Sequence, residues 1–158
     1  MIALHCMQLN LANGTFTILD ATLKDTSFSG TVLDTLTQNG VKVDFYGCAL
    51  SGKNQITCDT KVTSLNKDQA IGVVGESSSK LFDNLSNEYK ASTITALDKS
   101  GAGLIFNIIQ GIPVEVKFIY NSINPSATSI STFKPQFYTD SGTPNAYPFI
   151  ADFRDIEF

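Results

Sequence analysis

Two cysteines have the spacing in this chain that comes nearest to a chemical motif. Cys48 and Cys58 are ten positions apart, and Ser51-Gly52 between them is typical of a turn. If that turn joins two antiparallel strands, the cysteines lie opposite each other with about 4.5 to 5.5 Å between their Cα atoms, which is within disulfide range. We therefore predict a disulfide between Cys48 and Cys58.

The alternation of side chains around these cysteines contains a conflict. By strict alternation Cys58 lies on the apolar face of its strand, whereas Cys48 lies on the polar face that also carries Tyr46. Opposed partners must point to the same side of a sheet, so one residue has to be extra. Gly47 is the candidate, and we predict a β-bulge at Tyr46-Gly47 that turns Cys48 onto the apolar face.

A metal site and a reactive thiol pair are the competing interpretations of Cys48 and Cys58. Zinc needs further ligands, but the chain has one histidine, His5, and one more cysteine, Cys6, without the usual short ligand spacing. We favour the structural disulfide, and we expect Cys6 to be an unpaired terminal thiol. Because disulfides persist outside the cytoplasm, we expect a secreted, periplasmic or cell-surface location.

Catalytic combinations are scarce. A Ser-His-Asp or Cys-His arrangement would have to use His5, near the start of the sequence. The carboxylate pairs Asp152 with Asp155 and Asp83 with Glu88 suit glycoside chemistry, but solvated strand and turn positions explain them better. We predict that the protein is not an enzyme and uses no cofactor.

A group of oxygen ligands lies around one predicted turn. Asp83, Asn84, Asn87 and Glu88 offer oxygens to a calcium ion, yet they lack the spacing of a known calcium loop. Asp and Asn side chains commonly hydrogen-bond their own backbone in turns. We expect turn stabilisation rather than a bound metal.

Tyrosines are the candidates for surface contact, because the chain has no tryptophan. The alternation places Tyr46 outward, and Tyr147 lies in the loop 142–148, so we predict these two as surface-contact residues rather than Tyr120 or Tyr138. An aromatic platform of this kind suits a sugar or a protein partner.

The charge of the chain argues against a nucleic-acid partner, and its hydropathy argues against a membrane-spanning helix. The net charge is -4 and Arg154 is the single arginine, whereas binding to a phosphate backbone needs clustered lysine and arginine. We predict no nucleic-acid partner. No apolar run approaches the length of about 18 residues that a membrane helix requires, so we expect no membrane span.

Alternation with period two recurs along the chain, while helical periodicity is scarce. Pro135 lies inside one candidate strand, which favours an edge or bulged strand there. The least readable segment is 20–40. Within it, Asn39-Gly40 favours one short helix over 31–40 rather than a strand followed by a loop. The candidate strands are 41–48, 56–63, 70–74, 79–83, 88–93, 103–110, 113–120, 129–138 and 148–158.

This pattern predicts an all-β antiparallel sandwich of seven to nine strands in a single domain over 1–158, with 1–14 as a flexible N-terminal segment. We find no repeat, linker or low-complexity tract that would indicate a second domain.

The order of four runs resembles the bacterial telokin-like, immunoglobulin-like domains of exported proteins. These runs are ITCDTKVTSLNKDQAIGV, SKLFDNLSNEYKAS, IIQGIPVEVKFIYNSIN and TSISTFKPQFY. The likeness spans 41–138 and is nearest to the small cyanobacterial-type versions that carry a Cys, Ser-Gly, Cys hairpin. Ser86 stands where the family usually has glycine, so we expect Asn87 to take the left-handed conformation instead. The resemblance implies an immunoglobulin-like sandwich of unknown function and no shared catalytic residues.

Two functions follow as hypotheses. The first is a non-catalytic extracytoplasmic interaction or structural module that binds a protein or glycan, and the second is a ligand-binding or accessory domain with a pocket between or at the ends of the sheets. An outward patch of Tyr and Phe beside the loop 139–148 favours the first, and a deep pocket with convergent polar groups favours the second. We favour the first. The sequence leaves the partner and the oligomeric state unknown.

Overall fold

The computed structural model describes residues 30–157, which form fourteen β-strands in three antiparallel sheets and contain no helix. The large sheet has six strands in the order β1(Asp34–Gln38)-β2(Val41–Gly52)-β3(Gln55–Ser64)-β10(Val114–Asn121)-β7(Thr93–Ala96)-β8(Lys99–Gly101). The β4 sheet has the order β13(Tyr147–Ile150)-β12(Gln136–Thr139)-β4(Gln69–Val74)-β9(Gly103–Ile108). The β5 sheet has the order β14(Phe153–Glu157)-β11(Ser129–Lys134)-β5(Lys80–Asp83)-β6(Glu88–Lys90).

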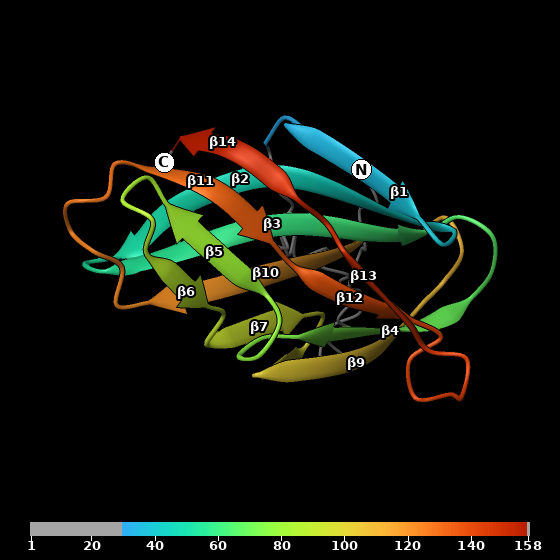
Figure 1. Ribbon diagram of the computed structural model, residues 1–158. Helices are drawn as coiled ribbons and strands as arrows, with labels where there is room; N and C mark the ends of the chain where they lie inside the picture. Colours follow the sequence, from blue (N-terminus) through green and yellow to red (C-terminus); the bar gives the residue numbers. More distant parts are fainter. Residues whose placement is uncertain (1–29, 158) are drawn as a thin grey trace, which may run out of the picture.

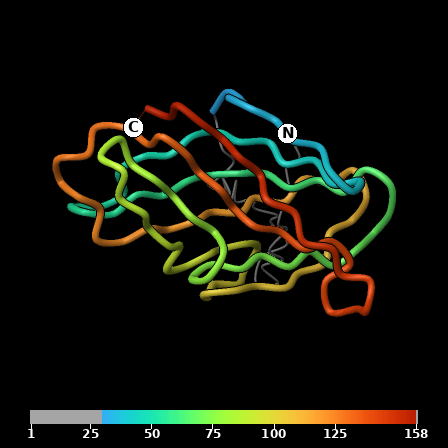
Figure 2. Tube along the Cα trace, in the orientation of Figure 1, coloured from blue at the N-terminus to red at the C-terminus, as the bar shows by residue number. Residues whose placement is uncertain are grey.

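The two small sheets together form one layer that packs on the large sheet. Figure 1 shows β5, β11 and β14 of this layer in front of β2 and β3. The chain runs from one small sheet into the other without reversing between β11 and β12 and between β13 and β14, as the orange and red parts of the trace in Figure 2 show. The expected all-β sandwich is confirmed.

The strands outnumber the seven to nine expected because the candidate strands 129–138 and 148–158 are each interrupted and because β1, β7 and β8 were not expected as separate strands. Proline has no N–H for the ladder, and the candidate strand 129–138 breaks at Pro135 into β11 and β12. Both halves lie inside their sheets, so the edge alternative was wrong. The bulged alternative has some support, because the register of β11 against β5 shifts between Ile130 and Thr132. The carbonyl of Pro135 accepts a hydrogen bond from the N–H of Ala151 at 3.1 Å, where β13 gives way to β14.

The helix expected over 31–40 is also absent, and β1 occupies this segment. Asn39 and Gly40 both have left-handed φ values, 52° and 73°. Two successive left-handed residues form the tight turn of a β-hairpin rather than the end of a helix. β1 consequently pairs with β2 from Asp34 opposite Phe45 to Gln38 opposite Val41.

The core lies between the layers and is rich in phenylalanine. Phe45 of the large sheet stacks on Phe153 of the β5 sheet with 4.6 Å between ring centroids. Phe118 of the large sheet meets the rings of Phe133 and Phe137 edge-on, at 5.4 and 5.9 Å. These rings join all three sheets.

The predictions for the N-terminal residues lie outside the residues that the structure describes. This applies to the segment 1–14 and to His5 and Cys6. Across residues 30–157, no helix is long and apolar enough to cross a membrane.

Candidate functional site

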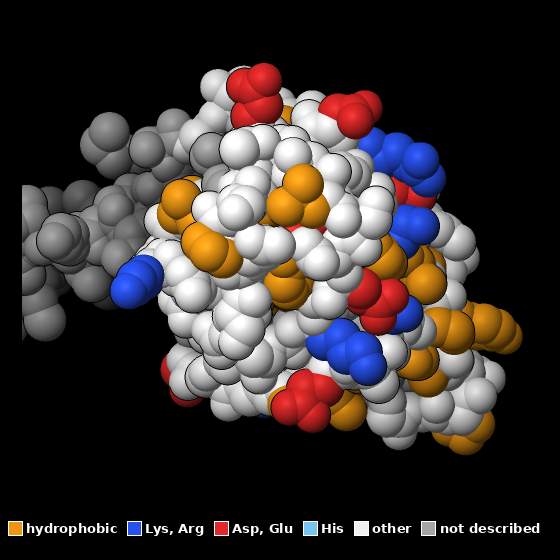
Figure 3. All heavy atoms as spheres, turned by 60° about the vertical axis from the view of Figure 1, so that its left-hand side comes forward, with side chains coloured by type: hydrophobic (Ala, Val, Ile, Leu, Met, Phe, Trp, Pro, Cys, Tyr) orange, Lys and Arg blue, Asp and Glu red, His pale blue; other side chains and the backbone are white. Residues whose placement is uncertain are grey.

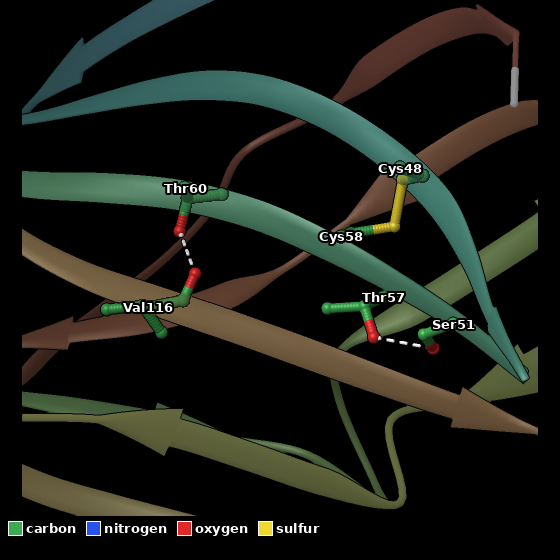
Figure 4. Close-up of a disulfide and its surroundings, with 6 residues drawn as sticks. All are labelled: Cys48, Ser51, Thr57, Cys58, Thr60 and Val116. Carbon is green, nitrogen blue, oxygen red and sulfur yellow. Dashed lines mark hydrogen bonds between the residues drawn. A yellow bond between two sulfur atoms is a disulfide. The ribbon is translucent and has the colours of Figure 1, made fainter. Parts of the chain in front are cut away.

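The predicted disulfide is present, with its Cα atoms closer together than the expected range of about 4.5 to 5.5 Å. Cys48 and Cys58 are joined, with 4.0 Å between their Cα atoms (Figure 4). Phe45 pairs with Thr60 and Gly47 pairs with Asp59, so Tyr46 is the extra residue of a bulge. Gly47 has a φ of 122°, a conformation that favours glycine. The predicted bulge at Tyr46-Gly47 is therefore confirmed, but the extra residue is Tyr46 and not Gly47, as the sequence had suggested.

The disulfide faces the core rather than solvent. Cys58 is fully buried and Cys48 is 7% exposed. Cys58 lies opposite Phe118 of β10, and the neighbouring Thr60 donates a hydrogen bond to the buried carbonyl of Val116 (Figure 4). A sulfur pair in this position stabilises the β2–β3 hairpin and has no access to a substrate.

The two tyrosines predicted as surface contacts lie in different layers. Tyr46 lies in the bulge of the large sheet, half-buried, with the Lys61 ammonium 5.0 Å from its ring centroid. Tyr147 begins β13 and is 61% exposed. The structure does not bring these two rings together into one platform.

The oxygen-rich turn after β5 is organised by hydrogen bonds of its own. The buried Asp83 carboxylate accepts hydrogen bonds from the N–H groups of Leu85 and Asn87 and from the hydroxyl of Tyr89. Burial by itself raises the pKa of Asp83, but these hydrogen bonds and that from the Asn87 amide outweigh burial and hold the pKa below its usual range. Ser86, not Asn87, is the left-handed residue, with a φ of 66°, so that expectation was wrong.

The other carboxylates considered for catalysis or metal binding have salt-bridge partners or are exposed. Glu88 forms a salt bridge with Lys80 at 3.1 Å, and Asp152 forms one with Arg154 at 2.8 Å. Asp155 is exposed on β14. Within residues 30–157, no group of three or more His, Cys, Asp or Glu side chains is placed to hold a metal ion.

Three charged side chains, Asp59, Glu115 and Lys117, lie together on the outward side of the large sheet. Lys117 is 2.9 Å from the carboxylate of Glu115 and 3.9 Å from that of Asp59. Burial raises the pKa of Asp59 to about 6; Lys117 opposes this rise and Glu115 adds to it. Because the pKa of Asp59 is shifted in the folded chain, this arrangement makes stability depend on pH.

The surface that does resemble a binding site is the outward side of the β4 sheet. Phe137 and Phe149 point into the core, so the residues alternating with them point outward. Two cross-strand rows of outward residues result, and we call them together the groove face. The rows are Ile105-Gly72-Tyr138-Pro148 and Gly103-Val74-Gln136-Ile150.

A shallow groove of about 390 Å³ lies in the groove face. Its floor includes the exposed Gly103 and the buried Gly72, and Tyr138 and Ser141 line one side and Ile105 the other. A Cβ at Gly72 would collide with the side chain of Ser141 and lie 3.3 Å from Cβ of Tyr138. Gly72 therefore allows the loop after β12 to pack against the sheet.

The lining of the groove is uncharged and mainly apolar. No Asp, Glu, Lys, Arg or His is among the residues that line it. The Tyr138 hydroxyl accepts a hydrogen bond from the Gln136 amide at 3.0 Å. Of the charged groups nearby, Lys99 donates a hydrogen bond to the carbonyl of Ile105, and Lys67 pairs with Asp140. An uncharged, mainly apolar group is the occupant that this lining favours.

The groove residues were not among those predicted from the sequence, although the alternation of side chains already indicated the direction of one of them. Alternation with the core residue Phe137 already places Tyr138 outward. The pairing that sets Gly72 beside Tyr138 and Ile105 joins segments far apart in the sequence, and no local pattern predicts it.

Comparison with known proteins adds little to this geometry. No family model matches the chain, and no curated protein matches it. A solved structure with some likeness is the collagen-binding subdomain of the Enterococcus faecalis surface protein ACE. The identity is 13%, the likeness covers 70% of this chain and 96% of the other, and the TM-score is 0.31. A likeness this low carries no conclusion about the partner of the present chain.

Proposed function

We propose that this protein is a non-catalytic interaction module that contacts a protein or glycan partner through the groove face. The observation that carries the proposal is an uncharged, mainly apolar surface across four strands with an open groove at its centre. Ile105 and Ile150 are 52% and 51% exposed there. Contiguous exposed apolar surface of this kind is typical of interaction sites.

The disulfide supports a location outside the cytoplasm. Cys48 and Cys58 are joined within one hairpin and packed into the core. Structural disulfides form and persist in oxidising compartments. The resemblance to telokin-like domains of exported bacterial proteins agrees with such a location, and we retain this family and a single domain over 1–158 as part of the proposal.

The alternative of a ligand pocket has less support. The groove is open and shallow, and its lining offers the hydroxyls of Tyr138 and Ser141 rather than several convergent polar groups. A panel of metal ions and small ligands read by thermal shift tests this alternative. A rise of several degrees with one ligand would favour the pocket, because tight binding to the folded state raises its apparent stability.

Two groove variants and one matched control test the proposed function. Gly103→Leu fills the groove without a clash, because a Cβ there meets only the Val73 carbonyl, at an ordinary 3.5 Å. Ile105→Lys places a charge beside the groove. Leu50→Lys is the control and adds the same charge at an exposed aliphatic side chain elsewhere, in the hairpin of the large sheet.

We expect at least one protein or glycan, from a panel of purified extracellular proteins and a glycan array, to bind the full chain and the Leu50→Lys variant. We expect that binding to be lost in Gly103→Leu and Ile105→Lys. Equal binding by all four proteins would place the contact elsewhere and refute the groove face as the site.

A further inference from the structure

The groove face continues into a charged surface on the same side of the molecule. Every second residue from Phe133 to Phe137 is buried, so Lys134, Gln136 and Tyr138 all point outward along β11 and β12. Gln136 and Tyr138 belong to the groove face, and Lys134 follows about 7 Å farther along the strand. A ligand that lies on the groove face therefore has a charged neighbour within reach.

Three lysines lie side by side on this charged surface, and we call them the lysine row. Lys80 of β5 pairs with Lys134 of β11 on one side and with Lys90 of β6 on the other. Neighbouring strands are about 4.8 Å apart, so these like charges repel one another and reduce the stability of the sheet. In Figure 3, Lys and Arg side chains form a band on the right of the view, and hydrophobic side chains gather below it. A row of cations beside an apolar surface is complementary to a partner that carries anionic groups.

The lysine row has hydrogen-bond donors left for such a partner. Lys80 forms a salt bridge with Glu88 at 3.1 Å and Lys134 forms one with Asp152 at 3.6 Å, and both lysine side chains are more than a third exposed. An ammonium group has three N–H donors, so each lysine can keep its carboxylate and still bind an anion. Lys90 is exposed and takes part in no salt bridge among residues 30–157.

The positive charge is confined to the lysine row, which favours a narrow anionic partner. Arg154 donates two hydrogen bonds to the carboxylate of Asp152, and Asp155 and Glu157 follow it in β14. The chain as a whole has a net charge of -4. A broad anionic surface, such as a bilayer or a nucleic acid, would also meet these carboxylates and be repelled by them, whereas a single narrow chain meets mainly the lysines.

The groups around the lysines favour a glycan over an acidic peptide. Sugar rings have apolar C–H faces that suit the ring of Tyr138 and the uncharged groove. Sugar hydroxyls also donate hydrogen bonds to carboxylates such as those of Glu88 and Asp152, which would repel an acidic side chain. A peptide laid over the groove would bury backbone N–H and C=O groups against an apolar lining, and unpaired polar groups are costly to bury.

We propose that the partner of this surface is an acidic glycan, with sugar rings over Tyr138 and the groove and with carboxylate or sulfate groups bound by the lysine row. This inference rests on the proposed function, because it names the chemical class of the partner of the groove face. The contact involves no covalent step.

Biolayer interferometry of the full chain on immobilised polymers at pH 7 tests this inference. Polygalacturonate carries carboxylates and dextran sulfate carries sulfates, while dextran is a neutral glycan and polyglutamate is an acidic peptide. We expect at least one of the two acidic glycans to bind, and we expect the binding to weaken as the salt concentration rises. Dextran and polyglutamate are expected to bind more weakly.

Variants of the full chain assign the binding to this surface. The triple variant Lys80→Gln with Lys90→Gln and Lys134→Gln is expected to weaken binding of the acidic glycan by about tenfold. Lys90→Gln alone is expected to weaken it by about twofold to fivefold, whereas Lys53→Gln, which removes an exposed lysine from the turn between β2 and β3, should have little effect. Gly103→Leu, which fills the groove, should also weaken it. Circular dichroism melts verify that each variant is folded.

Four results would overturn the inference. They are no binding of either acidic glycan, equal binding of dextran, equal binding of polyglutamate, and a triple variant that binds as tightly as the parent. Failure of the proposed function gives a different result. If no acidic glycan binds but Gly103→Leu abolishes binding of another protein or glycan, the proposed function stands with a different partner. If the triple variant loses the acidic glycan while Gly103→Leu keeps it, the lysines bind anions without the groove, which overturns the inference and also removes the groove face as the site of that contact.

Discussion

At the scale of single residues, the buried carboxylate of Asp83 and the half-buried carboxylate of Asp59 respond to pH in opposite directions. Asp83 is held ionised by donors from its own turn and from Tyr89. Asp59 shares Lys117 with Glu115 and is disfavoured as an anion by burial. The direction of each pKa shift therefore predicts a different dependence of stability on pH.

The first prediction concerns Asp83. Its pKa is lower in the folded chain than the ordinary 3.8, so its stabilising contribution is present above about pH 4 and is lost as the pH falls through the folded-state pKa. Asp83→Ala leaves the donors of Leu85, Asn87 and Tyr89 without this acceptor, and we expect it to reduce the free energy of unfolding at pH 7 by about 2 kcal/mol. Urea unfolding at pH 7 and pH 3 measures the difference from the parent, which should shrink at pH 3. An equal difference at both pH values would contradict the assigned role.

The second prediction has the opposite sign. The pKa of Asp59 is raised to about 6, so its ionised form is destabilising at pH 7, and protonation relieves this as the pH falls toward 5. Partial exposure and Lys117 limit the effect to about 1 kcal/mol or less. We expect the parent to gain stability relative to Asp59→Asn between pH 7.5 and pH 5 in urea unfolding. Parallel stability curves for the two proteins would refute this prediction.

At the scale of elements, the bulge in β2 is the feature on which the disulfide depends. Gly47 has a φ of 122°, and a Cβ there would also lie 3.3 Å from the Leu33 side chain. We expect Gly47→Ala to reduce the free energy of unfolding by about 1 to 3 kcal/mol, because a side chain is strained in this conformation. Gly52→Ala is the matched control, since Gly52 lies in the same strand without a left-handed φ. Equal effects of the two substitutions in urea unfolding would show that the bulge does not require glycine.

Elements with a strong local pattern were predictable from the sequence. The alternation in 41–48 and 56–63 predicted β2 and β3, and its conflict at the cysteines predicted the bulge. β1 was missed because Asn39-Gly40 ends helices and also forms hairpin turns, and the pairing with β2 decides between them. The passage of one strand through two sheets at Pro135 depends on the neighbouring strands, so the sequence showed an interruption but not its consequence.

At the scale of the whole molecule, the candidate site was the part least accessible to sequence reasoning. The groove face takes its strands from three distant segments, 69–74, 103–108 and 136–150, and its hollow is lined by residues of all three. Tyr147 was chosen from its loop composition, whereas Tyr138 lines the groove. Local patterns predict which way a side chain points, but only the order of strands decides which outward residues become neighbours.

The same long-range assembly decides what holds the fold together. Phe133 lies within 5.5 Å of Phe45 and 5.4 Å of Phe118, between ring centroids, and therefore joins the two layers. The disulfide closes a short loop within one hairpin, which the chain-entropy model values at about 3 kcal/mol.

We expect Phe133→Ala to reduce the free energy of unfolding by about 3 to 5 kcal/mol, at least as much as the double substitution Cys48→Ala with Cys58→Ala. The double variant should keep the near-ultraviolet circular dichroism of a packed aromatic core, because loss of the disulfide leaves the aromatic contacts between the two layers in place. If the double variant instead loses that signal while Phe133→Ala unfolds like the parent in urea, the hairpin staple rather than the phenylalanine cluster maintains the sandwich.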